Sequence, residues 1–272
     1  MINITKYFFL LACLVIIGCT SCNTNTSNNT GTGNPAIPES EKKLRNVVNQ
    51  YPDSLLAKEN LIQYFRENGN YGQAISETEM ALKKDSANDR LWDIKATLQI
   101  ENGDTGNAIK AFEKAIEINP QPPYILSLGS LYAQTKNPLA LAMADGLLQA
   151  PKANAQKQAL FIKGLYYSYT GDKIKALSFF DICLQIDYRD MLAYREKAIC
   201  LYDLQKYTEA IQVLQKSITI QQTFDEGYYW LGRCYEKLGK RKEAIENYQL
   251  ALQIDPDFIE AKDALGKMGV TL

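Results

Sequence analysis

The side chains that most often perform chemistry are either missing from this 272-residue chain or present without an evident pattern. There is no histidine, which excludes histidine-based catalytic triads, imidazole metal ligands and the commonest general base. The 31 Asp and Glu could supply a carboxylate pair that hydrolyses a cell-wall glycan, but nearly all of them fall on expected helix faces or in turns, where hydration explains them. We therefore expect a protein with no catalytic residues, no metal site and no cofactor.

The charge balance argues against nucleic acid as the main partner, although it leaves open a local basic face. Lys and Arg number 30 and the formal net charge is −1, so no global positive excess is available to neutralise phosphates. Apolar residues make up 46% of the chain and charged residues 22%, which is enough apolar material to bury a sizeable core. Function must therefore be sought in how the chain is organised.

The first 18 residues have the pattern of an export signal. Lys6 is followed by an apolar run, residues 7–18, which is too short to span a bilayer comfortably but fits the apolar region of a secretory signal. The run ends in the residues IIGC, which resemble the lipobox of bacterial lipoproteins with Cys19 as the acylated residue. This resemblance implies a mature chain that begins at Cys19 and is anchored to a membrane by fatty acyl chains such as palmitate. An alternative match ends at Cys13 with a shorter apolar region, and an ordinary signal peptide or an uncleaved apolar tail are further alternatives.

Residues 19–38 are expected to form a flexible tether between the lipid anchor and the folded domain. They carry no charge from Cys22 to Pro38 and almost no large apolar side chain, so they cannot form a core. Cys19 and Cys22 have the C-x-x-C spacing of redox and metal sites, but no second pair and no strand-helix-strand context accompany them. A C-x-x-C site is therefore not expected here.

The remaining chain, residues 39–272, has a period of 34 residues. Setting the recurring alanine as position 20 of each repeat gives six repeats, which cover about three-quarters of the chain. The repeats are residues 55–88, 89–122, 123–156, 157–190, 191–224 and 225–258. The alanines that define the phase are Ala74, Ala108, Ala142, Ala176, Ala210 and Ala244.

The last repeat has the fullest pattern of small, aromatic and proline residues, namely Leu231, Gly232, Tyr235, Ala244, Tyr248, Ala251 and Pro256. This pattern resembles the tetratricopeptide repeat, a pair of antiparallel helices that stacks on its neighbours. The resemblance implies an all-α protein, an α-solenoid of six helix-turn-helix repeats, with a single helix before the array (residues 39–50) and another after it (residues 259–268). Small residues at positions 8, 20 and 27 would let helix backbones approach closely, and glycines at position 15 would end the first helices.

The third repeat departs from this pattern. Pro138 lies in its central turn, Pro151 shortens its second helix, and its Gly129 and Tyr132 lie one residue early. It is either a degenerate repeat that the array tolerates or a widened joint that divides the array into halves.

Three cysteines fall at positions where the repeat expects buried side chains. Cys183 occupies position 27, and Cys200 and Cys234 occupy position 10 of adjacent repeats. Helices of adjacent repeats lie about 9 to 10 Å apart, which is beyond the reach of a disulfide. We therefore expect free, buried thiols.

In tetratricopeptide proteins the first helices line a concave groove that receives peptides or partner helices, and positions 2, 5, 9, 12 and 13 lie on that face. Some members bind C-terminal carboxylates of chaperones through Lys at position 5 and Asn at position 9, but no repeat here has that pair. The face is apolar, rich in tyrosine and flanked by arginine, a composition typical of binding hot spots. The predicted groove residues are Tyr124, Leu131, Phe161, Leu165, Tyr169, Arg195, Ile199, Tyr202, Tyr229 and Arg233. Alternatively, several of these aromatic side chains pack inside the solenoid.

Together these features predict a non-catalytic scaffold that is anchored by lipid to a membrane of the bacterial cell envelope. The layout is similar to that of tetratricopeptide lipoproteins, which implies an outer-membrane location facing the periplasm and a protein or peptide partner in the groove. The competing hypothesis is an envelope enzyme that acts on cell-wall glycan through acidic residues. No spare segment of the chain could form its substrate cleft.

Overall fold

The computed structural model of this protein describes residues 37–149 and 153–271. The predicted signal peptide (1–18), Cys19 and most of the predicted tether (19–38) lie outside the described residues. Among residues 37–149 and 153–271, none of the helices combines the length and the apolar character that spanning a bilayer requires. The chain divides into two compact units, an N-terminal unit that runs through Tyr124 and a C-terminal unit that starts at Ile125.

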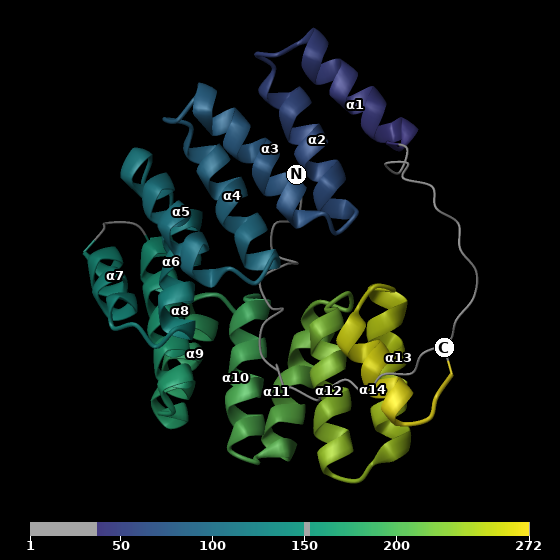
Figure 1. Cartoon of the computed structure of the whole chain (residues 1–272). Helices are drawn as coiled ribbons and strands as arrows, with labels where there is room; N and C mark the ends of the chain where they lie inside the picture. The colour runs from purple at the N-terminus through teal and green to yellow at the C-terminus, as the bar shows by residue number, and fades with distance from the viewer. Residues whose placement is uncertain (1–36, 150–152, 272) are drawn as a thin grey trace, which may run out of the picture. The chain divides into compact units, whose positions relative to one another are not determined.

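The described chain is entirely helical, with short turns between the helices (Figure 1). Six helix pairs, from α2–α3 to α12–α13, follow the six predicted repeats, and single helices α1 and α14 precede and follow them. This confirms the predicted α-solenoid. The helices are α1 (Glu39–Gln50), α2 (Leu55–Glu67), α3 (Tyr71–Lys84), α4 (Asp89–Glu101), α5 (Thr105–Ile118), α6 (Pro122–Gln134), α7 (Leu139–Leu148), α8 (Ala153–Thr170), α9 (Lys173–Ile186), α10 (Met191–Asp203), α11 (Tyr207–Ile220), α12 (Asp225–Lys237), α13 (Arg241–Ile254) and α14 (Ile259–Lys267).

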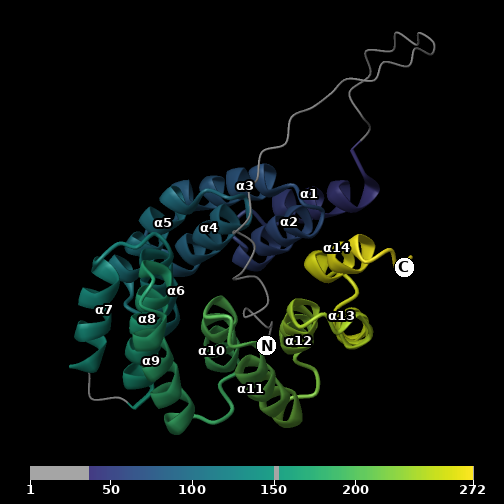
Figure 2. The ribbon, with the colours of Figure 1, turned by 90° about the horizontal axis from the view of Figure 1, so that it is seen from below.

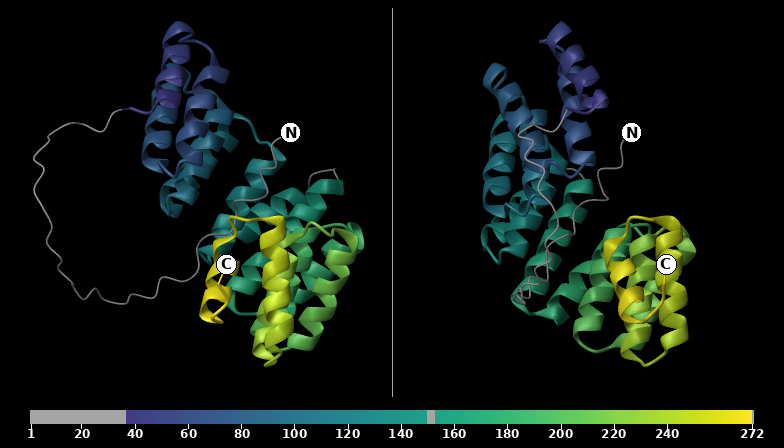
Figure 3. Two further views of the ribbon diagram at one scale, coloured as in Figure 1. Left: turned by 90° about the vertical axis from the view of Figure 1, so that its right-hand side faces the viewer. Right: turned by 45° about the vertical axis from the view of Figure 1, so that its right-hand side comes forward.

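In the C-terminal unit the helices form two layers, with α10, α12 and α14 in one layer and α11 and α13 in the other (Figure 2). Helix α10 contacts both α8 and α12, so successive first helices are direct neighbours. The antiparallel pairs remain side by side in the further views of each unit (Figure 3). Side chains on the first helices of adjacent repeats can therefore contact one another within this layer.

Turn chemistry explains where several helices begin and end. Asp104, Asp172 and Asp190 each accept a hydrogen bond from the backbone N–H three residues later and so cap the following helix. The glycines at position 15 all have positive φ, as predicted for helix stops: Gly69 (70°), Gly103 (79°), Gly171 (100°) and Gly239 (72°). In repeat five this position is Gln205, which adopts φ 60° without being glycine.

The core of each repeat is built on close approaches between its two helices. A Cβ atom added at Gly232 would lie 2.6 Å from Cε1 of Tyr248, and one added at Gly164 would lie 2.6 Å from Cε1 of Phe180. Both rings are fully buried. The expectation that position 8 must stay small is therefore confirmed in repeats four and six, where a ring from position 24 fills the space.

The third repeat differs from the others in register. Five of the six phase-defining alanines are completely buried, but Ala142 is exposed, and Ala140 and Ala144 point into the core instead. The 34-residue spacing of Ala142 therefore does not reflect an equivalent position, because α7 is rotated about its axis relative to the other second helices. The first helix of this repeat, α6, also ends one residue early, at Gln134, and the left-handed residue that follows it is Lys136 with φ 56°.

Candidate partner-binding surface

Helices α8, α10 and α12 carry eight of the ten predicted groove residues. A helix repeats every 3.6 residues, so side chains three or four apart along each of these helices share a face. A residue on one first helix also meets the residue 31 positions later, on the first helix of the next repeat. Three such pairs are hydrogen-bonded, Glu59 with Arg90, Arg195 with Glu226 and Tyr202 with Arg233.

The structure places the ten predicted groove residues in two environments. Leu131, Phe161, Leu165 and Arg195 are buried. Phe161 is the aromatic member of these four, and its burial agrees with the alternative that aromatic side chains pack inside the solenoid. The most buried of the four, Leu131 and Leu165, are 2% exposed. A role of these four residues in binding stays a prediction. The other six are partly exposed: Tyr124, Tyr169, Ile199, Tyr202, Tyr229 and Arg233.

Phe161 and Tyr169, both on α8, show how aromatic side chains of the predicted set take part in the interior. The Phe161 ring packs on the Phe180 ring at 5.7 Å between centroids, so it supports the α8–α9 pair. Burial raises the pKa of the Tyr169 phenol, to which the neighbouring charge of Glu196 adds. Truncation of Phe161 is therefore expected to weaken folding as well as any binding.

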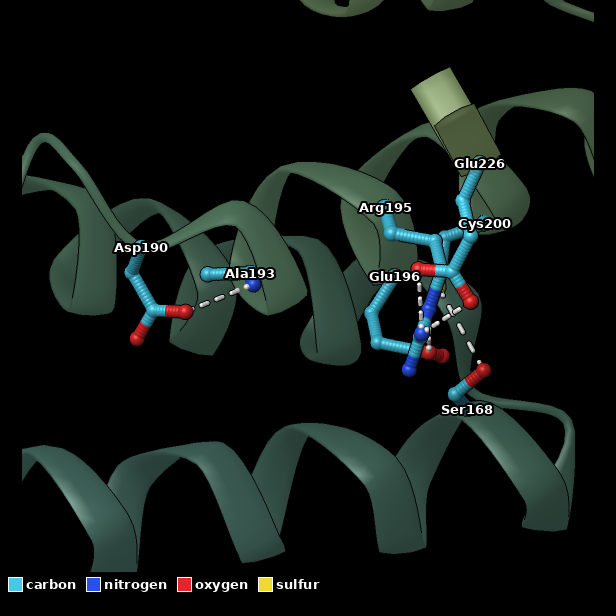
Figure 4. A network of polar contacts seen from close by, with 7 residues as sticks. All are labelled: Ser168, Asp190, Ala193, Arg195, Glu196, Cys200 and Glu226. Atoms are coloured by element: carbon cyan, nitrogen blue, oxygen red, sulfur yellow. Dashed lines mark hydrogen bonds and ion pairs between the residues drawn. The ribbon is translucent and has the colours of Figure 1, made fainter. Parts of the chain in front are cut away.

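Arg195 on α10 forms a buried ion-pair network (Figure 4). Its Nε donates to Oε1 of Glu196 at 3.0 Å, and its Nη1 donates to both carboxylate oxygens of Glu226 on α12 at 2.7 Å. Arg195 and Glu196 are 4% and 2% exposed. Burial alone would lower the pKa of the guanidinium, but the two carboxylates raise it, so Arg195 stays charged. Burial raises the pKa of Glu196 in spite of its arginine partner.

Cys200 lies beside this network and is not a reactive thiol. Its Sγ donates to Oγ of Ser168 on α8 at 3.4 Å (Figure 4). Burial raises the pKa of Cys200 to about 11 and those of Cys183 and Cys234 to about 12. All three are free and buried, as predicted, and they stay protonated near neutral pH, which makes them poor nucleophiles.

Arg233 on α12 lies among three aromatic rings, those of Tyr202, Tyr229 and Trp230. We call these four residues the Arg233 cage. The guanidinium carbon lies 5.3 Å from the Tyr202 centroid, 5.8 Å from that of Tyr229 and 5.3 Å from that of Trp230. Nη1 donates to the Tyr229 hydroxyl at 2.9 Å and Nη2 to the Tyr202 hydroxyl at 3.2 Å. The hydrogen bonds and rings fix the orientation of the guanidinium plane.

A wider aromatic cluster holds the cage in place. Tyr202 packs edge-on against Tyr207 at 5.3 Å, and Tyr229 contacts Tyr248 at 5.8 Å and Phe258 at 5.0 Å. Tyr248 in turn donates its hydroxyl to Oε2 of Glu236 at 2.8 Å. The cage is therefore supported from α11, α13 and the turn before α14, which limits how far its side chains can move.

Two parts of this surface were not predicted from the sequence. Trp230 occupies position 6, outside the expected face, although its spacing of three residues from Arg233 could have indicated contact on one helix. Glu226 could have been found by asking which residue lies 31 positions after Arg195. The sequence did predict Tyr202, Tyr229 and Arg233, and the structure brings them together.

The first helices of the N-terminal unit present a different, charged surface. Tyr124 donates its hydroxyl to Oδ2 of Asp89 at 3.1 Å, and burial, helped by nearby Asp93, raises its pKa to about 12. Burial also raises the pKa of Asp93 to about 6. Ion pairs connect adjacent repeats here, Arg66 with Glu101 and Arg90 with Glu59. In the described residues no group of His, Cys, Asp and Glu is arranged to hold a metal ion.

Comparisons with known protein families find matches to several of these helix pairs. Residues 89–122 and 226–258 match the family described as tetratricopeptide repeat, and residues 200–239 match the one described as TPR repeat. The chain therefore contains tetratricopeptide repeats, as the 34-residue period predicted. Proteins built from these repeats generally mediate protein–protein or peptide binding and are typically scaffolds or adaptors rather than enzymes.

Among curated proteins the chain is similar to parts of larger ones. It is 25% identical over 129 residues to human Superkiller complex protein 3, which is 47% of this chain and 8% of that protein. It is 24% identical over 205 residues to the DnaJ homolog subfamily C member 7 homolog of Dictyostelium discoideum, which is 69% of this chain and 38% of that protein. The chain thus spans less than half the length of these relatives.

Solved structures show the same fold. A tetratricopeptide repeat protein from Parabacteroides merdae aligns with a TM-score of 0.67 at 19% identity and covers 84% of this chain and 90% of its own. PilW, described as a type IV pilus biogenesis factor, aligns with a TM-score of 0.55 at 20% identity over 76% of this chain and 96% of its own. At these identities the likeness concerns the fold alone.

Proposed function

We propose that this protein is a lipid-anchored scaffold of the bacterial cell envelope that holds a protein or peptide partner on the first helices of its C-terminal unit. The observation that supports it most is the partly exposed surface of α10 and α12, where Ile199, Tyr202, Tyr229 and Arg233 gather. Partly exposed tyrosines around an arginine are the composition that protein-binding hot spots favour. The anchor rests on the lipobox-like residues 16–19, with Cys19 as the acylated residue.

Photo-crosslinking from the surface tests the scaffold. A photoreactive amino acid at Ile199 on α10 is expected to give a discrete adduct in cells, whereas the same group at the exposed Gln215 on α11 is not, because second helices lie in the other layer. Tyr202→Ala should reduce the Ile199 adduct. Equal adducts from both positions, or none from Ile199, would contradict a partner on this face.

Metabolic labelling with an alkyne analogue of palmitate tests the anchor. The wild-type chain and Cys13→Ser should incorporate the label and fractionate with membranes, because the lipobox-like residues end at Cys19. Cys19→Ser should lose the label and stay unprocessed. Labelling that survives Cys19→Ser and disappears in Cys13→Ser would instead place the modified residue at Cys13.

A further inference from the structure

The guanidinium of Arg233 forms no ion pair with a carboxylate of the described residues. Its hydrogen-bond partners are the two phenols of its cage, and no described Asp or Glu oxygen lies within 4.0 Å of it. Arg195, one repeat earlier, is paired with two carboxylates. The two arginines therefore differ, since Arg195 completes an internal ion pair, whereas Arg233 is in hydrogen-bond or ion-pair contact with no carboxylate of the described residues.

The cage offers hydrogen-bond donors and lacks an acceptor that would use them. A guanidinium has five N–H donors, of which Arg233 uses two on the cage phenols. Tyr202 and Tyr229 each accept a hydrogen bond from Arg233, so each still has its own O–H to donate. Within residues 37–149 and 153–271, neither O–H has an acceptor. A group that only accepts hydrogen bonds and carries negative charge completes such a site. In an unmodified protein chain near neutral pH, the group with these properties is a carboxylate.

The surroundings favour a carboxylate on a side chain over one at a chain end. Helix α12 lies between α10–α11 on one side and α13–α14 on the other, so the cage lies inside the array rather than at its edge. A bound segment that crosses α12 therefore continues over neighbouring first helices. Its residues beside the carboxylate would meet aromatic rings of the wider cluster, including Tyr207 and Phe258, which favours apolar neighbours in the segment.

We propose that the Arg233 cage binds the side-chain carboxylate of an Asp or Glu that lies among apolar residues in an extended segment of a partner protein. This inference rests on the proposed function, because it names the chemistry of the partner on the same surface. It also assigns the roles within the site. Arg233 supplies the charge, the hydroxyls of Tyr202 and Tyr229 supply additional donors, and Trp230 closes the apolar wall.

Selection from a random dodecapeptide display library tests the proposal with the full-length chain in detergent. Peptides selected by the wild type should be enriched in Asp or Glu flanked by aromatic or aliphatic residues. Peptides selected by Arg233→Met should lose the enrichment in acidic residues and keep the enrichment in apolar residues. Arg233→Lys should keep part of the acidic enrichment, because lysine retains the positive charge but lacks the paired N–H donors of the guanidinium. Arg241→Met is the matched control, since Arg241 donates to the Met268 carbonyl away from the cage and should change nothing.

The fluorescence of Trp230 reports binding at the Arg233 cage itself. The chain has two tryptophans, and Trp92 belongs to the N-terminal unit, so Trp92→Phe leaves Trp230 as the sole tryptophan reporter. Titration with a selected peptide, acetylated and amidated, should shift its emission. Replacing the acidic residue of the peptide by Gln or Asn, or Arg233 by Met, should each weaken binding about tenfold or more, and the two changes together little more than either one.

The outcomes separate the two proposals. If peptides are selected without acidic enrichment, or if the Gln or Asn peptide binds as well as the acidic one, the carboxylate assignment is wrong while the peptide-binding surface stands. If the Gln or Asn peptide regains affinity when its C-terminus is left free, the site takes a terminal carboxylate and the side-chain assignment is overturned. If no peptide is selected, the proposed function fails, and this inference fails with it. Far-ultraviolet circular dichroism of each variant checks that the helices are intact.

Discussion

Replacing Gly232 by Ala adds one methyl group at the closest approach of α12 and α13. The new Cβ would lie 2.6 Å from Cε1, 2.7 Å from Cδ1 and 3.0 Å from Cζ of Tyr248. That ring cannot easily move away, because it is completely buried, contacts Tyr229 and is held by a hydrogen bond from its hydroxyl to Glu236. The two helices must therefore separate or the ring must leave its preferred rotamer.

Two opposing terms set the size of the effect. Overpacking of a well-filled core costs about 1–3 kcal/mol. Replacing glycine by alanine inside a helix gains about 0.5–1 kcal/mol. Gly146 on α7 isolates the second term, because it is also a helical glycine of the C-terminal unit but has nothing within 4 Å of its added Cβ. Gly146→Ala should stabilise the protein slightly, and Gly232→Ala should be less stable than Gly146→Ala by about 1–3 kcal/mol.

Urea unfolding followed by circular dichroism, with the midpoint and slope fitted for each variant, measures this difference. A Tyr248→Ala background completes the test, because without the ring Gly232→Ala should cost no more than Gly146→Ala does. Equal stability of the two alanine variants in the wild-type background would refute the argument that position 8 is kept small by the ring at position 24.

Three further predictions follow from single residues. Gln205→Gly should raise the free energy of unfolding by about 1 kcal/mol, because it relieves a left-handed backbone at φ 60°; Gly239→Ala should lower it by a similar amount, and neutral results in urea melts would contradict both. Arg195→Met should cost about 3–5 kcal/mol because it leaves the Glu196 carboxylate buried without its partner, and adding Glu196→Gln should recover part of the loss, which thermal unfolding would reveal. Asp93 has a raised pKa, about 6 against a usual 3.8, which means that the folded state holds the proton of this carboxyl more tightly than the unfolded state does. The protonated carboxyl therefore stabilises the fold at low pH, and this contribution is lost as the pH rises from about 4 to about 6. Asp93→Asn should therefore be more stable than the wild type at pH 7 by up to about 3 kcal/mol and no more stable below pH 4; a difference that does not vary with pH would show that burial does not control this group.

The repeat architecture could be predicted in detail because it is written in local spacing. The small residues, the position-15 glycines and the prolines act within a few residues of where they stand, through backbone conformation and the period of the helix. The third repeat shows the limit of this reasoning. Ala142 keeps the 34-residue spacing yet is exposed, because the rotation of α7 about its axis is set by which of its faces packs on the neighbouring helices. Spacing along the chain does not contain that information.

The candidate surface was predicted only in part for the same reason. The sequence placed Tyr202, Tyr229 and Arg233 on one face, since helical periodicity fixes which residues of one helix are neighbours. It could not decide that Phe161 packs inward, because burial depends on the second helix of the same repeat.

The sequence by itself thus determined the all-helical repeats, the helix ends and the set of side chains available for binding. The tertiary structure alone decided how the charges are paired. Arg195 and Arg233 have the same chemistry, but Glu226 reaches the first across one repeat, while the second meets aromatic rings and phenols and no carboxylate among the described residues. The physical reason is that contacts between first helices join residues 31 positions apart. Whether such a pair neutralises a charge or leaves it available depends on the side chains that the packing of two helices brings within hydrogen-bond distance.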